Sequence, residues 1–149
     1  MPLLPSFLPL LGTWAGTQRL AASPGAAATT ARAWLVLKLD VAATVVVQDY
    51  RQVRADGVEL SGHGVFRAEP GTDAVLWWFF DSDAQLPAPV RGRWQGATLE
   101  LEQPTADGRL RHRLRAEGDR LEHDVRHRPV GDPEWWPVLT GAYGRLSGH

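Results

Sequence analysis

Strict alternation of polar and apolar residues runs through the segment from Gly108 to Arg128 and predicts two β-strands. In the first strand, arginine occupies every second position from 109 to 115, and leucine, histidine or alanine lies between. In the second strand, charged residues alternate with an inner face that includes Leu121 and Val125. The Gly118-Asp119 pair between the strands is typical of a two-residue hairpin loop.

Such a loop pairs Glu117 with Arg120 and fixes the register along both strands. The register sets Arg113 opposite Asp124 on the outer face, which is a favourable cross-strand pair. The inner face is otherwise apolar. Three of the five histidines of the chain nevertheless share it: His112, His123 and His127.

Runs rich in valine, threonine and aromatic residues predict eight further strands. Their expected ranges are 12–20, 29–39, 42–54, 58–69, 74–81, 90–94, 97–103 and 137–146. Gln95-Gly96 signals a hairpin that sets Arg91 opposite Glu100, and Ser82 to Pro89 is expected to form a loop at the mouth or cap. About ten strands joined mainly by hairpins predict an all-β protein, a single antiparallel up-and-down β-barrel, with a β-sandwich as the alternative.

Asp56-Gly57 signals a further hairpin, and a two-residue loop there sets Tyr50 opposite His63. If that face is internal, it forms a polar wall able to orient a carbonyl or hydroxyl group. The other face is more apolar and would bring Asp49 and Arg51 inside, beside glycines that leave room for them. The two arrangements exclude each other unless a bulge swaps the faces, and the apolar pattern favours Asp49 and Arg51 inside.

The composition narrows the class of protein. A chain of 149 residues with a net charge of −1 fits one domain, and its interspersed charges offer no basic stripe for nucleic acid. Because cysteine is absent, disulfides and thiolate metal sites are excluded, and we expect a cytoplasmic protein. No segment is apolar enough to span a membrane. The proline-containing residues 1–11 are expected to form a short helical lid or plug.

Aromatic residues and the three histidines are the candidate ligand contacts. The favoured interpretation of the aromatic run from Trp77 to Phe80 is that it belongs to the hydrophobic core. If the run instead lines a cavity, Trp78 and Phe80 are the expected ligand contacts. Three converging imidazoles could bind zinc or iron, or supply a general base with a pKa near neutrality. The favoured interpretation is that they line a cavity as polar groups satisfied by one another and by water. No phosphate-binding loop or nucleophile elbow occurs.

Five segments, LLGTWAG, VVVQDYR, GHGVF, FDS and RGRWQGATLELE, occur in this order along the chain. From about Leu10 to Arg145 the sequence resembles a bacterial family of small calycin-like proteins, domain of unknown function 1579. The resemblance implies a lipocalin-like or fatty-acid-binding-like barrel with a central cavity, in which Trp14 packs across the floor. Nitrobindins are similar calycins that bind haem through a histidine. Residues 138–146 contain no histidine, so no haem ligand carries over by position.

These observations predict a protein that binds a hydrophobic or aromatic small molecule in the barrel, without a cofactor and without nucleic acid or membrane partners. The alternatives are a cofactor-independent cyclase or isomerase of a polyketide-like or terpenoid-like compound, with His112 or His63 as the acid-base group, and haem or metal binding by the histidine cluster. A homodimer is left open. The expected ligand contacts are Asp49, Tyr50, Arg51, His63, Trp78, Phe80, His112, His123 and His127.

Overall fold

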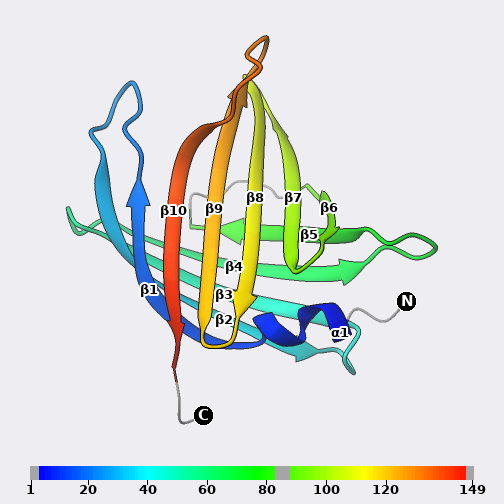
Figure 1. Ribbon diagram of the computed structural model, residues 1–149. Helices are drawn as coiled ribbons and strands as arrows, with labels where there is room; N and C mark the ends of the chain where they lie inside the picture. The colour runs from blue at the N-terminus through cyan, green and yellow to red at the C-terminus, as the bar shows by residue number, and fades with distance from the viewer. Residues whose placement is uncertain (1–3, 83–87, 147–149) are drawn as a thin grey trace.

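The chain folds into a closed barrel of ten antiparallel strands that follow one another in sequence order, as shown by a computed structural model that describes residues 4–82 and 88–146 (Figure 1). Strand β10 pairs with β1, so the predicted up-and-down barrel is confirmed. The strands are β1 (Gly12–Leu20), β2 (Thr29–Asp40), β3 (Val45–Arg54), β4 (Glu59–Ala68), β5 (Val75–Asp81), β6 (Val90–Gln95), β7 (Thr98–Thr105), β8 (Gly108–Glu117), β9 (Arg120–Pro129) and β10 (Trp136–Arg145). Closure gives every strand two neighbours and leaves no free edge.

Two groups of strands cross one another to form the barrel wall. In Figure 1 strands β7 to β10 and β1 run steeply across the front, while β2 to β5 run across the back. Alternation within the strands fills the space between the two groups. In β2, for example, Ala33, Leu35 and Leu37 are buried, whereas Arg32 and Lys38 are exposed.

A short N-terminal segment, α1 (Leu4–Phe7) followed by the 3₁₀ turn η1 (Leu8–Leu10), packs into the lower end of the barrel in Figure 1. The Phe7 ring is fully buried, and its centroid lies 5.3 Å from the ring centroids of both Phe66 and Trp94. The indole N–H of Trp14 donates a 3.0 Å hydrogen bond to the carbonyl oxygen of Leu10. These aromatic rings therefore form a solid floor.

Arg145 covers the outside of this floor. Its guanidinium carbon lies 4.2 Å from the Trp14 ring centroid, and its Nε lies 3.4 Å from a carboxylate oxygen of Asp119. The C-terminal strand is thereby tied to the β8–β9 turn and to the N-terminal segment.

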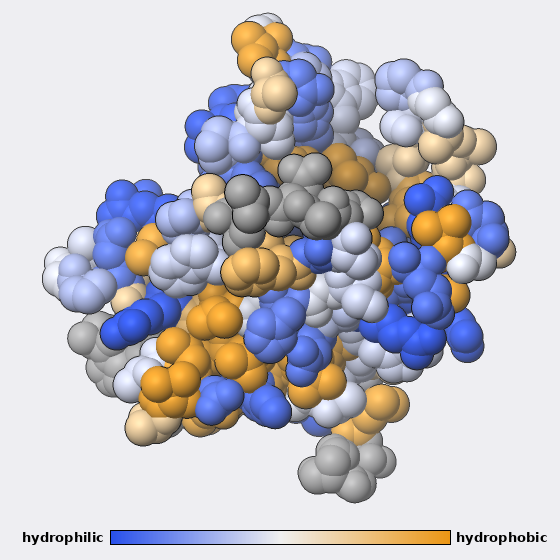
Figure 2. All heavy atoms as spheres, turned by 180° about the vertical axis from the view of Figure 1, so that it is seen from behind, coloured by the Kyte–Doolittle hydropathy of each residue, from blue (hydrophilic) through white to orange (hydrophobic). Residues whose placement is uncertain are grey.

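The outer surface is mostly polar. Figure 2 shows the rear face, where hydrophilic residues interrupt hydrophobic ones and the latter gather at the lower left, the end that carries α1 and the β2–β3 turn. Leu8 and Val41 are among the exposed residues of that end. In the described part of the chain, no helix is long and apolar enough to cross a membrane.

The predicted register of the β8–β9 hairpin is confirmed, with Glu117 opposite Arg120 and Arg113 opposite Asp124. The ion pairs differ from this cross-strand pattern. Nε of Arg113 contacts a carboxylate oxygen of Glu100 on β7 at 2.9 Å. The register therefore does not determine the ion pairs, because an outer arginine can also pair with a carboxylate on its other neighbouring strand.

The predicted register of the β3–β4 hairpin is wrong by one residue. Arg54 and Val58 close a three-residue loop, in which Gly57 has a φ of +88° and an Asp56 carboxylate oxygen accepts from the Val58 N–H at 3.0 Å. The extra loop residue places Asp49, rather than Tyr50, opposite His63. Since strand side chains alternate, this single step exchanges the faces of β3 relative to β4.

The β6–β7 hairpin is shifted by two positions. Its loop is Gly96-Ala97, so Gln95 pairs with Thr98 and Arg91 lies opposite Glu102, where Glu100 was expected. A shift of two residues keeps every side chain on its predicted face.

Replacing Phe7 by alanine should lower the free energy of unfolding by about 3–5 kcal/mol, because it removes a buried ring from the floor. Chemical denaturation followed by tryptophan fluorescence measures the change. Leu8→Ala is the matched control, since the adjacent Leu8 side chain is exposed and its loss should cost less than about 0.5 kcal/mol. Equal effects of the two substitutions would show that the segment does not close the barrel.

Candidate functional site

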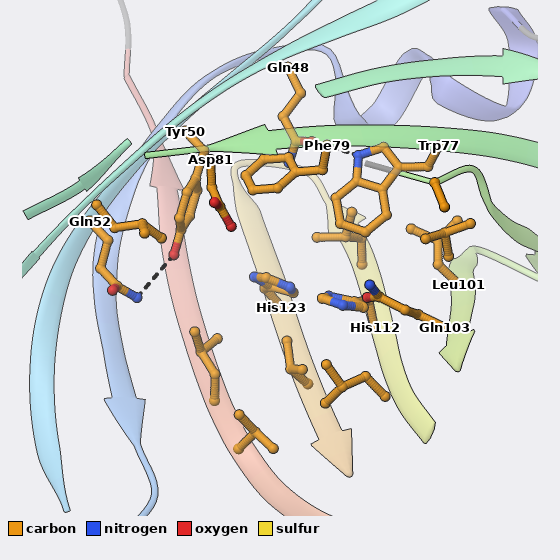
Figure 3. Close-up of a pocket in the computed structure, with 18 of the residues that line it drawn as sticks. Gln48, Tyr50, Gln52, Trp77, Phe79, Asp81, Leu101, Gln103, His112 and His123 are labelled. Carbon is orange, nitrogen blue, oxygen red and sulfur yellow. Dashed lines mark hydrogen bonds between the residues drawn. The ribbon is translucent and has the colours of Figure 1, made fainter. Parts of the chain in front are cut away.

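Beyond the aromatic floor, toward the other end of the barrel, lies a cavity of about 590 Å³, whose lining residues are drawn in Figure 3. Side chains from both groups of strands line it. The polar lining residues are Gln48, Tyr50, Gln52, Asp81, Gln103, His112 and His123. The principal apolar ones are Trp77, Phe79, Leu101, Leu114 and Val125.

Strand β3 supplies the amide and phenol wall of the cavity. Gln48 and Gln52 are buried and Tyr50 is half-buried, because all three occupy inward positions of the strand. On β4, glycines lie opposite Gln48 and Tyr50. A Cβ on Gly62 would lie 2.0 Å from the Phe79 ring, and one on Gly64 would lie 2.3 Å from the Gln48 side-chain oxygen. The glycines therefore make room for the cavity wall itself.

Strand β5 supplies the aromatic wall. Trp77 stacks on Phe66 of the floor with ring centroids 5.7 Å apart, and Phe79 follows it along the cavity. The assignment of Trp78 and Phe80 to the lining is wrong by one position, since alternation turns them outward and Phe80 is 52% exposed.

A hydrogen-bonded network joins Gln18, Gln52 and two tyrosines beside the cavity. Nε2 of Gln18 donates to the hydroxyl oxygens of Tyr50 and Tyr143 at 2.8 and 2.7 Å. Nε2 of Gln52 donates to Oε1 of Gln18 at 2.7 Å and to the Tyr50 hydroxyl at 3.2 Å. Burial raises the pKa of both Tyr50 and Tyr143, so both phenols stay protonated.

His112 and His123 face the cavity from neighbouring strands, as predicted. Their rings are nearly parallel, with centroids 5.9 Å apart. The His112 and Trp77 rings are steeply inclined to each other, and their centroids lie 5.1 Å apart. Burial lowers the pKa of His112 to about 3, with the charge of His123 as a smaller cause, and it lowers the pKa of His123 to about 4. Both imidazoles are therefore neutral near pH 7, in contrast to the expected pKa near neutrality.

Several predicted contacts lie away from the cavity. Asp49 and Arg51 point outward, so the expectation that they face the interior is wrong. His63 is on the outer surface too, where its Nδ1 lies 2.8 Å from a carboxylate oxygen of Asp49. Nε2 of His127 lies 3.3 Å from a carboxylate oxygen of Asp107, and His127 does not line the cavity.

The polar wall of β3 was one of two alternatives in the sequence, because the choice of face depended on one loop length. Asp81 and Gln103 were not identified from the sequence. Gln48, Gln52 and Tyr50 share a face in the sequence, and a three-residue loop around Gly57 is a known alternative to a two-residue loop. No feature of the sequence identified Gln18, because a single glutamine within a strand does not show which residues it will bond with. Within residues 4–82 and 88–146, no group of three histidine, cysteine, aspartate or glutamate side chains could hold a metal ion.

The neutral histidines predict a pH-dependent stability. The unfolded chain binds protons at histidine near pH 6.5, whereas the folded chain does so only near pH 4 and below. Stability should therefore fall as the pH drops from about 6.5 to about 4, by up to about 1.4 kcal/mol per pH unit for each histidine. His112→Phe and His123→Phe should each make this dependence shallower in urea denaturation between pH 7.5 and 4.5. An unchanged slope in the double variant would contradict the prediction.

Comparisons with solved structures find the same barrel fold. The solved structure of Rv2717c from M. tuberculosis superposes with a TM-score of 0.71 and is 24% identical, over 97% of this chain and 99% of that chain. An S-type phycobiliprotein lyase, CPES from Guillardia theta, superposes with a TM-score of 0.71 at 10% identity, over 100% of this chain and 95% of the lyase.

The two structures share the fold of this chain, and identities this low carry no more than the fold. No protein-family model matches the sequence, and no curated protein is significantly similar to it. The resemblance to domain of unknown function 1579 therefore stays a prediction, whereas the closed, antiparallel ten-stranded barrel is the observed architecture.

Proposed function

We propose that the protein binds an apolar or aromatic small molecule inside the barrel. The observation that carries the proposal is the cavity of about 590 Å³, which lies within the range of small-molecule sites. Its walls combine aromatic and aliphatic surface with a few converging polar groups, which is the usual composition of such sites.

The aromatic wall supplies most of the attraction. A flat guest lying against Trp77 and Phe79 buries apolar surface and adds stacking worth about 0.5–1.5 kcal/mol for each favourable ring pair. The solid floor supports this wall from below, since Trp77 is stacked on Phe66. The binding surface is thus preorganised, which lowers the entropic cost of binding.

The phycobiliprotein lyase is an example of this fold with a named activity. At 10% identity the similarity supports the barrel fold only, and the proposed ligand depends on the cavity of this chain.

Binding accounts for the site better than the two alternatives. A cyclase or isomerase needs an acid-base group, and imidazoles with pKa values of about 3 and about 4 are weak bases at neutral pH. The other candidate, His63, lies on the outer surface. Haem or metal binding was expected to use a cluster of three histidines. His127 does not line the cavity, so only two of the three face it.

Filling the cavity should abolish binding. Gln103→Trp places an indole among the lining side chains, and we expect it to weaken binding of the neutral dye Nile red at least tenfold. Nile red fluorescence titration measures the dissociation constant, and circular dichroism checks that the variant folds. Glu122→Trp, on the exposed outer face of β9, is the control and should bind as the unmodified protein does. Equal affinities for all three proteins would place the dye, and the proposed site, outside the cavity.

A further inference from the structure

The described lining of the cavity contains no arginine or lysine. Among the described lining residues the only charged group is Asp81, whose carboxylate points into the cavity in Figure 3. The arginines of β8 instead lie on the outer face, as Arg113 does in its contact with Glu100. An anionic guest would therefore lose its hydration without gaining a counter-charge from the described lining.

The Tyr50 hydroxyl has a hydrogen to donate to a guest. Its oxygen accepts from Nε2 of Gln18 and from Nε2 of Gln52, so both lone pairs are occupied and the O–H is left over. The two amide orientations are consistent with each other. Reversing either amide alone would bring two like atoms of Gln18 and Gln52 to 2.7 Å, either two nitrogens or two oxygens.

Gln48 offers a second donor. The indole N–H of Trp77 can only donate, and it lies 2.9 Å from Oε1 of Gln48, which fixes the orientation of that amide. The two hydrogens on Nε2 of Gln48 are thereby turned away from the indole. They have no partner in the described part of the chain, and Gln48 lines the cavity.

The histidine pair adds one donor and one acceptor from each ring. Both imidazoles are neutral near pH 7, so neither can balance an anion. In Figure 3 Tyr50, His123 and His112 all point into the same space. The available groups together match a guest that is uncharged and carries acceptor oxygens.

We propose that the guest is a neutral, flat polycyclic molecule whose carbonyl oxygen accepts hydrogen bonds from Tyr50 and Gln48, and that carboxylates are excluded. This inference rests on the proposed binding function and specifies the chemical class of the ligand. It separates the protein from barrels that hold a carboxylate through an internal arginine, because the described cavity wall contains none.

Four probes that share one ring system test whether the cavity prefers a neutral ligand. They are pyrene, 1-acetylpyrene, 1-pyrenecarboxylate and 1-pyrenemethylammonium. At pH 7.5 the ketone should bind more tightly than pyrene and at least tenfold more tightly than the carboxylate. Quenching of tryptophan fluorescence measures the four dissociation constants. A preference for the carboxylate or for the ammonium compound would overturn the inference.

Tyr50→Phe tests the contact itself. The substitution should weaken 1-acetylpyrene about fivefold, the value of one hydrogen bond, and leave pyrene unchanged. Tyr143→Phe is the matched control, because Tyr143 belongs to the same network but does not line the cavity. Equal losses in both variants would show that the network, and no direct contact, determines affinity.

The two proposals fail in different ways. If none of the four probes binds, the proposed function fails. If all four bind with equal affinity and Gln103→Trp blocks them, the cavity is a binding site but the inferred ligand class is wrong.

Discussion

Closure of the strand ladder is the constraint on which the rest of the structure depends. Because β10 pairs with β1, no strand has a free edge, and every inward position must be filled by the chain or by a guest. At one end the chain fills the space, since Phe7 and Trp14 are fully buried there. At the other end the space stays open as the cavity. One barrel thus contains both a rigid support and a binding site.

Most polar groups of the interior carry no charge, and Asp81 is the one carboxylate among the described lining residues. Gln18, Gln52 and the two tyrosines bond with one another, and burial keeps the imidazoles neutral. Burying a charge without a partner costs several kcal/mol, whereas a hydrogen-bonded amide or phenol costs little. Apart from Asp81, the described polar lining of the cavity is therefore compatible with a stable barrel, and in our proposal the same property determines which guests the cavity accepts.

The sequence predicts the barrel well because alternation and turn residues are local signals. The β8–β9 hairpin follows entirely from the Gly118-Asp119 turn and from the alternation around it. The β3–β4 hairpin contains a similar turn pair, but its loop has one residue more, and that difference moved His63 to the outer surface. The fold tolerates such an error, since strands still pair. The site does not, since the step exchanges which side chains of β3 face the cavity together with those of β4.

The shortest seam of the barrel borders the cavity. Strands β5 and β6 share three paired positions, ending at Trp77 and Val90, whereas β8 and β9 share ten. Phe79 and Asp81 lie beyond the last pair on β5, and both line the cavity together with Val90. A seam with few ladder hydrogen bonds opens at a lower free-energy cost than its neighbours. The least-paired part of the described wall thus lies beside the aromatic residues of the cavity, while the floor at the other end is closed by buried rings.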